Sequence, residues 1–212
     1  MPYTEYTNRD EWVKSFDSRL GASEIGVICG AASYKTPAQL WQEKTGRKKP
    51  DDLSDNDRVS YGKEAEEHLR ALFVLKHKKY EVEYHPYRVY YAEEHPYLTA
   101  TLDGELTDKE TGGRGIYECK TALIQSKADY EEWDGKIPDK YYCQICQQMY
   151  VTGYDFAIIN AELRYPDGKA EIREYAVTRE EAADDIQYVV QKGAEFWQYV
   201  KKNKRPPVKI TI

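Results

Sequence analysis

Long apolar runs are missing from this sequence of 212 residues. No stretch approaches the ~20 consecutive apolar residues of a membrane span. The first residues, Met1 to Glu5, also lack the basic and apolar regions of a secretory signal. We therefore expect a cytoplasmic protein of a bacterial cell, with no membrane partner. An excess of basic residues is missing too. The net charge of −6 argues against a uniformly basic DNA-binding protein, but it is compatible with a local basic groove.

Cysteine is scarce, with only Cys29, Cys119, Cys143 and Cys146. Disulfides are disfavoured in the cytoplasm. Cys143 and Cys146 have the spacing of a ligand pair for a metal or an iron–sulfur cluster. No cluster of cysteines follows them toward the C-terminus. We therefore interpret the four residues as buried thiols.

The length and composition predict one ordered domain over residues 1–212, with 41% hydrophobic and 32% charged residues. We divide it into an N-terminal helical part of about residues 1–56, a core of about 57–178 and a C-terminal helix of about 179–203. Within the core, strands follow one long helix and precede another. This order favours an α/β fold with a central mixed β-sheet flanked by helices.

Periodicity and turn residues locate the individual elements. Thr36 and Pro37 provide an N-cap and a first helical residue, and Gly46 provides a stop. The strongest helix, residues 57–77, should bury Ala65, Leu69, Leu72 and Phe73. A loop with Trp133 to Gly135 should precede a later helix. The other predicted helices are 10–16, 23–29, 138–151 and 178–202, and the predicted strands are 80–84, 87–91, 98–106, 115–120, 156–163 and 170–177.

Two carboxylates and a lysine mark the candidate site. Side chains alternate along a strand, so Glu118 and Lys120 should project from one face and Cys119 from the other. Asp103 would lie beside them if its segment forms a hairpin with theirs. Carboxylates bind hard divalent cations such as Mg²⁺, which neutralise a scissile phosphate. The alternative is a solvated strand face, since alternating charges are common on exposed strands.

A second acid, Glu66, lies at the edge of the apolar face of the 57–77 helix, whereas Glu64 and Glu67 fall on its solvent side. A carboxylate at a buried edge needs a partner, which either a metal site or a structural ion pair would supply. Gln144 and Gln148 lie one helical turn apart. Their amides suit a lysine, a water or a phosphate, unless they form an ordinary polar flank.

Arg19 and Ser23 flank the start of a short predicted helix. An arginine, a serine and free N–H groups at a helix start suit a terminal phosphate. The same residues also make an ordinary N-cap, which is the more common arrangement.

Taken together, these segments resemble the YqaJ-type viral recombinase nucleases, a group that includes the lambda-type alkaline exonucleases. The resemblance covers roughly residues 19–160 in family order. It also places the chain in the PD-(D/E)XK nuclease superfamily, with Leu102-Asp103 where that motif has Pro-Asp. The matching segments are Gly21-Ala22-Ser23-Glu24-Ile25-Gly26, Tyr34-Lys35-Thr36-Pro37 with Leu40-Trp41 and Lys44-Thr45-Gly46, Tyr61-Gly62-Lys63 with Glu66, Leu102-Asp103-Gly104, Glu118-Cys119-Lys120, and Tyr142 with Gln144, Gln148-Met149 and Val151-Thr152-Gly153.

The resemblance implies a role for each site residue. Asp103 and Glu118 would bind Mg²⁺, or Mn²⁺ in its place, together with the backbone carbonyl of Cys119. Glu66 would complete the metal site directly or through water. Lys120 would position the attacking water, and Gln144 matches the family's glutamine on the next helix. Finally, Arg19 and Ser23 match positions that contact the 5′-phosphate of the digested end.

The implied activity is Mg²⁺-dependent 5′→3′ digestion of one strand of linear double-stranded DNA, in phage or prophage recombination. The resemblance also implies a single-strand annealing recombinase as partner and a ring of three subunits. Two alternatives stay open. One is a structure-selective or restriction-like endonuclease, and the other is a catalytically inactive DNA-binding scaffold on the same fold.

Overall fold

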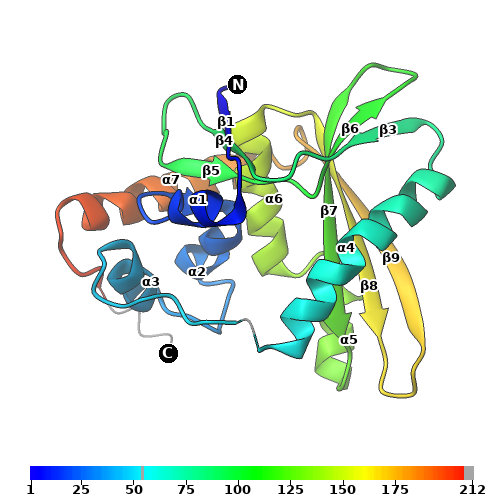
Figure 1. Cartoon of the computed structure of the whole chain (residues 1–212), viewed down its shortest axis with the longest axis horizontal. Helices are drawn as coiled ribbons and strands as arrows, with labels where there is room; N and C mark the ends of the chain where they lie inside the picture. Colours follow the sequence, from blue (N-terminus) through cyan, green and yellow to red (C-terminus); the bar gives the residue numbers. More distant parts are fainter. Residues whose placement is uncertain (54, 208–212) are drawn as a thin grey trace.

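The computed structural model describes residues 1–53 and 55–207 (Figure 1). Its helices are α1 (Arg9–Lys14), the 3-10 turn η1 (Ala22–Glu24), α2 (Ile25–Cys29), α3 (Pro37–Lys44), α4 (Asp57–Lys76), α5 (Lys127–Trp133), α6 (Asp139–Thr152) and α7 (Ala183–Lys201). Its strands are β1 (Tyr3–Glu5), β2 (Leu20–Gly21), β3 (Tyr80–Glu83), β4 (Arg88–Tyr91), β5 (Leu98–Ala100), β6 (Gly104–Asp108), β7 (Arg114–Leu123), β8 (Phe156–Arg164) and β9 (Ala170–Thr178).

The strands form two mixed sheets. One has the order β1-β4-β5-β2 and the other the order β3-β6-β7-β8-β9. The pairs β2–β5 and β7–β8 are parallel, and all other pairs in the two sheets are antiparallel. The predicted mixed α/β fold is confirmed, but the second sheet was not predicted. It arises because the expected strand 98–106 is interrupted: β5 ends at Ala100, and β6 begins at Gly104 in the other sheet.

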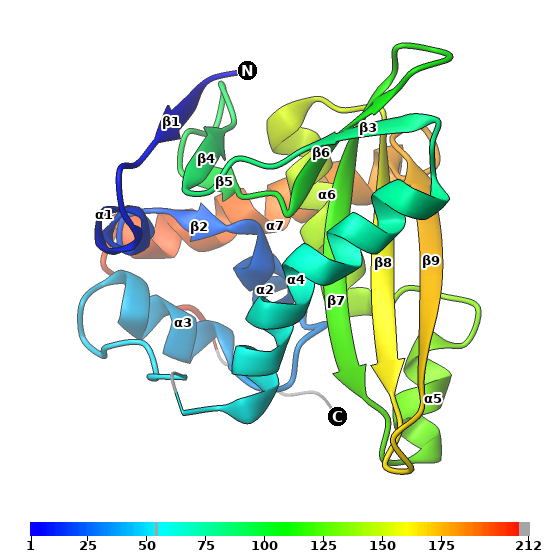
Figure 2. The same ribbon diagram turned by 45° about the vertical axis from the view of Figure 1, so that its right-hand side comes forward.

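Helices cover both faces of the five-stranded sheet, with α4 in front and α6 behind in Figure 2. Strand alternation explains the two layers. Tyr117 and Cys119 of β7 pack with Leu69 and Phe73 of α4. Ile116 instead belongs to the larger core cluster, which also includes the buried residues of α6 and α7. The side chains that alternate with Tyr117 and Cys119 therefore point toward α6. These include the two charged residues of the candidate site, Glu118 and Lys120.

Helix α4 covers the sheet with a narrower stripe than predicted. Leu69 and Phe73 are buried and Ala65 packs against the same cluster, so the inward positions are spaced by four residues. Leu72 is 36% exposed, and its prediction as a core residue is wrong. A single helix lying across one sheet buries only this stripe, and Leu72 falls beside it.

The N-terminal part, predicted to be helical, also contains β1 and β2. Within it, Thr36 and Gln39 form a capping box at the start of α3, and Pro37 occupies the first helical position as predicted. The helix ends at Lys44 with C-cap Thr45, and Gly46 follows in the left-handed conformation at φ 71°, as expected of the predicted stop. Helix α5 was not predicted. Its N-cap Ser126 accepts a hydrogen bond from the backbone N–H of Asp129.

A buried carboxylate joins the two sheets. Glu105 of β6 accepts hydrogen bonds from the hydroxyls of Tyr90, on β4, and Tyr154. It also pairs with Arg88 at 3.0 Å and with Arg114 at 2.7 Å. Its 5% exposure is compatible with a charge because both carboxylate oxygens have partners. The described part of the chain contains no helix long and apolar enough to cross a membrane.

Candidate active site

The predicted hairpin is present and places Asp103 beside β7. Strands β6 and β7 pair from Gly104↔Tyr117 to Thr107↔Arg114, whereas β7 continues to Leu123. The edge of β7 beyond Tyr117 is therefore not covered by β6. Asp103 lies at this point, where its Oδ2 accepts a hydrogen bond of 2.8 Å from the backbone N–H of Cys119.

Glu118 and Lys120 lie on the same face of β7, as alternation predicts. The Lys120 Nζ is 2.6 Å from Glu118 Oε1. Glu118 is only 2% exposed, so the pair is not a solvated strand face. Cys119 points to the opposite side and packs in the cluster under α4.

Two glutamines of α6 donate hydrogen bonds to the carboxylate of Glu118. Gln144 Nε2 donates to Glu118 Oε1 at 2.6 Å, and Gln148 Nε2 donates to Glu118 Oε2 at 2.7 Å. Gln148 also donates to the backbone oxygen of Thr101 at 3.0 Å. Both side chains are buried, so they are not an ordinary polar flank. Sequence reasoning did not assign Gln148 to the site, although its one-turn spacing from Gln144 was the available signal.

Arg70 of α4 is a second residue that sequence reasoning missed. Its Nη1 donates to the backbone oxygen of Asp103 at 2.9 Å, and its guanidinium lies 4.0 Å from the centre of the Tyr84 ring. Arg70 is four residues after Glu66, and residues at this spacing lie on one side of a helix. Helix α4 therefore contributes an anchor for Asp103 as well as the acid predicted there.

The ionisable side chains of the site shift one another's pKa. Burial and the Glu118 carboxylate raise the pKa of Asp103 well above its usual range, with Lys120 opposing. Burial and Glu118 also raise the pKa of Glu66. Burial opposes the charge of Lys120, but Glu118 and Asp103 raise its pKa and keep it an ammonium at neutral pH. Lys120 acts on Glu66 and Asp103 and pairs with Glu118, and Arg70 and Lys63 of α4 also oppose the rise in the pKa of Glu66.

The donor set fits a hard divalent cation. Asp103 and Glu118 offer carboxylate oxygens, which Mg²⁺ prefers. The N–H and C=O of one strand residue point to the same edge. The carbonyl of Cys119 therefore faces the edge where Asp103 lies. Within residues 1–53 and 55–207, however, no three His, Cys, Asp or Glu side chains already converge as a metal site. A cation would have to compete with Lys120 for Glu118.

The two predicted phosphate-binding residues are placed differently. Ser23 is exposed and, with Gln144, lines a pocket of about 240 Å³. Through Gln144, this pocket reaches helix α6. The Arg19 guanidinium instead donates to the hydroxyls of Tyr6 and Tyr91, each at 2.9 Å, and stacks on the Tyr91 ring. The structure therefore brings Ser23, but not the Arg19 head group, to a pocket shared with the site.

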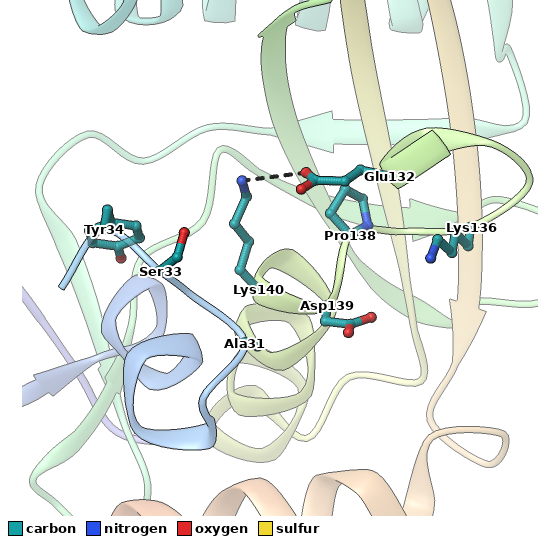
Figure 3. Close-up of a pocket in the computed structure, with 8 residues that line it drawn as sticks. All are labelled: Ala31, Ser33, Tyr34, Glu132, Lys136, Pro138, Asp139 and Lys140. Atoms are coloured by element: carbon teal, nitrogen blue, oxygen red, sulfur yellow. Dashed lines mark ion pairs between the residues drawn. The ribbon is translucent and has the colours of Figure 1, made fainter. Parts of the chain in front are cut away.

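A second, polar pocket of about 150 Å³ lies between residues 31–34 and the segment from Glu132 to Lys140 (Figure 3). Tyr34 faces Lys140 across it, and Lys140 pairs with Glu132 at 3.8 Å. The Tyr141 ring connects this pocket to the site. Its centre is 4.9 Å from the Lys120 ammonium and 5.0 Å from that of Lys140. The rim therefore carries two ammonium groups and two tyrosines, together with the carboxylates of Glu132 and Asp139.

Residues 11–155 match the YqaJ-like viral recombinase domain. The chain belongs to this family. It is 28% identical over 154 residues to the uncharacterized protein YqaJ of Bacillus subtilis (strain 168). It is also 27% identical over 153 residues to the uncharacterized protein R354 of Acanthamoeba polyphaga mimivirus. The matches cover 70% and 68% of this chain but only 44% and 27% of those proteins, so the chain spans less than half the length of either relative.

Solved structures show the same fold at low identity. The alkaline exonuclease LHK-Exo of Laribacter hongkongensis superimposes with a TM-score of 0.66 at 16% identity, covering 92% of this chain and 94% of that one. A complex of LHK-Exo with dAMP gives 0.62 at 19% identity, covering 93% and 97%. A phage-related exonuclease from Haemophilus somnus 129PT gives 0.57 at 14% identity, covering 87% and 96%. At these identities the similarity establishes the fold alone.

Proposed function

We propose that this protein is a Mg²⁺-dependent 5′→3′ exodeoxyribonuclease that digests one strand of linear double-stranded DNA for phage or prophage recombination. The observation that carries the proposal is the cluster of Asp103, Glu118 and Lys120 at the point where β6 and β7 diverge. We further propose that this hairpin, with α4 and α6, is a PD-(D/E)XK core. Family membership and the exonuclease-like fold support both proposals.

The proposed metal ligands are the carboxylates of Asp103 and Glu118 and the backbone carbonyl of Cys119. Glu66 would complete the set directly or through water, and Mn²⁺ would substitute for Mg²⁺. When bound, the cation would neutralise the scissile phosphate and make a bound water more acidic. The pKa values of Asp103 and Glu66, which Glu118 helps to raise, support this assignment, because an added cation relieves the mutual repulsion of the carboxylates.

The protein's own side chains would position the reactants. Gln144 and Gln148 hold both oxygens of Glu118 in place. Lys120, displaced from Glu118 by a cation, would be free to donate to the attacking water or to the phosphate. Ser23 would contact the 5′-phosphate from its pocket. For Arg19 to join it, the guanidinium would have to exchange Tyr6 and Tyr91 for the phosphate.

The decisive experiment uses linear duplex DNA labelled at one 5′ end, a closed circular duplex, and Mg²⁺ or EDTA. Release of labelled mononucleotides from the linear DNA alone, prevented by EDTA, is the expected result. Cleavage of the circle would instead indicate the endonuclease. No cleavage of either DNA, with binding retained, would indicate the inactive scaffold.

The proposed assembly needs separate measurements. We propose a homotrimeric ring around the duplex and a single-strand annealing recombinase as partner, both by similarity to lambda-type enzymes. Light scattering of the protein in solution should give three times the chain mass of 24.7 kDa. A monomeric mass would refute the ring, but it would leave the nuclease unaffected.

A further inference from the structure

Helix α2 packs against α6 (Figure 1), and each of these helices carries a cysteine that lines one shared pocket. The helices approach closely, because a Cβ atom added to Gly26 would lie 3.2 Å from the Cα of Lys140. Cys29 lies three residues beyond Gly26, and Cys143 lies three residues beyond Lys140. Both cysteines line the same pocket, and the Cys29 thiol is close enough to lower the pKa of Cys143. The close helix packing therefore brings two thiols from distant parts of the sequence near each other.

This thiol pair is reachable from solvent. Cys29 and Cys143 are partly exposed, which corrects the prediction that all four cysteines are buried. Both line an open pocket of about 280 Å³, together with Asp139 and Asp185. Cys146, one turn further along α6, is completely buried. Small reagents can therefore reach the pair but not the neighbouring thiol.

The surroundings favour one class of reagent. Hydrogen bonding from Cys29 lowers the pKa of Cys143, although burial and the carboxylates of Asp139 and Asp185 oppose this. A lowered pKa gives Cys143 a larger thiolate fraction than an ordinary cysteine, and the thiolate is the form that reacts with peroxide. The same two carboxylates repel anionic oxidants such as oxidised glutathione. A small uncharged oxidant meets no such barrier.

We propose that Cys29 and Cys143 form a peroxide-sensitive modification site that closes to a disulfide between α2 and α6. The Cys143 thiolate attacks one oxygen of hydrogen peroxide, the O–O bond breaks, and hydroxide leaves, which gives a sulfenic acid. Cys29 then attacks the sulfenic sulfur. The S–O bond breaks and water leaves with the thiol proton. Overall, two thiols are oxidised and one peroxide is reduced to two waters.

The disulfide would have a structural consequence near the candidate active site. Helix α2 directly follows the turn that carries Ser23, and α6 carries Gln144. These two residues line one pocket. A bond between the helices would fix the separation of its two walls. The proposal rests on the thiol geometry alone and does not depend on nuclease activity.

The test treats the wild-type protein with hydrogen peroxide, removes the peroxide with catalase, blocks remaining thiols with N-ethylmaleimide and maps tryptic peptides without reduction. We expect a linked pair of peptides that contain Cys29 and Cys143, with a mass two hydrogens lower than the sum of the reduced peptides. Because Cys143 and Cys146 share one tryptic peptide, the experiment is repeated with Cys146→Ser, which should retain the link.

Two further variants test the assigned roles. In Cys29→Ser, Cys143 should stop at the sulfenic acid and react with dimedone. In Cys143→Ser, Cys29 should give no dimedone adduct and no linked peptide. The proposal is overturned if the wild-type protein keeps both thiols reactive to N-ethylmaleimide after peroxide treatment. A link between Cys143 and Cys146, lost in Cys146→Ser, would overturn it as well.

Discussion

Replacing Gln148 by methionine tests whether the amides of α6 serve the site or only the fold. Gln148 is completely buried, and its Nε2 bridges Glu118 and the backbone oxygen of Thr101. Gln147 offers a matched control. It is equally buried, and its Nε2 bridges the backbone oxygens of Leu20 and Thr99 at 2.9 and 3.0 Å, without touching Glu118.

The hydrogen bonds that each glutamine makes determine how far its replacement should lower the free energy of unfolding. A hydrogen bond to a charged group contributes about 1.5–3 kcal/mol, and a neutral one about 0.5–1.5 kcal/mol. The Oε1 atoms of both glutamines are buried with no hydrogen-bond partner among the described residues. Removing such an atom returns part of its desolvation cost. We therefore expect Gln148→Met to lower the free energy of unfolding by about 1–3 kcal/mol, and Gln147→Met by about 0–2 kcal/mol.

Activity should separate the two variants. Supporting residues of a metal site typically change activity or metal affinity by about 10–100-fold. We expect that loss for Gln148→Met in Mg²⁺-dependent digestion of linear duplex DNA, and little change for Gln147→Met. Urea unfolding gives the stability, and the kinetics are measured well below both unfolding midpoints. Equal losses of activity in the two variants, or full activity in Gln148→Met, would refute the positioning role.

Three further predictions follow from the charges. Lys120→Ala should leave DNA binding largely intact and abolish cleavage, measured by gel shift and digestion; unchanged cleavage would remove Lys120 from the mechanism. Glu66→Gln should weaken Mg²⁺-dependent cleavage while Glu67→Gln, on the exposed side of α4, should not; identical metal titrations would contradict a metal role. The pKa of Glu105 is lowered by hydrogen bonds from its tyrosines despite burial. The ionised Glu105 should therefore stabilise the folded state fully above its unfolded-state pKa of about 4.3. This stabilisation should be lost as the pH falls through the lower pKa of the folded state. Unfolding free energies of the wild-type protein and Glu105→Gln should thus converge in acid, and a gap that widens there would disprove this.

The sequence predicted the parts of the site that depend on local geometry. Alternation along one strand correctly placed Glu118 and Lys120 on the same face, with Cys119 opposite. The hairpin that brings Asp103 to them needed only a turn between two short strands. Helical periodicity placed Glu66 at a partly buried edge. These relations hold within a few residues, where backbone geometry alone decides which side chains are neighbours.

Two of the missed features join segments that are distant in the sequence. Arg70 reaches the backbone of Asp103 from another element, and Glu105 collects partners from both sheets. The residues that neighbour Arg70 and Glu105 in the sequence do not indicate which partners these two side chains have. The break between β5 and β6 was also missed, although Asp103 and Gly104, which are disfavoured within strands, lie at it. Helix α5 is different, since its Ser126-x-x-Asp129 cap was visible in the sequence.

The choice of glutamine at positions 144 and 148 also has a physical explanation that the sequence alone does not reveal. A buried carboxylate needs several donors, and Glu118 has three, of which only Lys120 carries a charge. Two further cations would satisfy the same oxygens but would cancel the negative charge that the proposed divalent metal would require. Neutral amides fix the carboxylate and leave its charge available. A lysine at position 144 would therefore preserve the hydrogen bond while weakening metal binding, whereas methionine would remove the hydrogen bond and leave the charge.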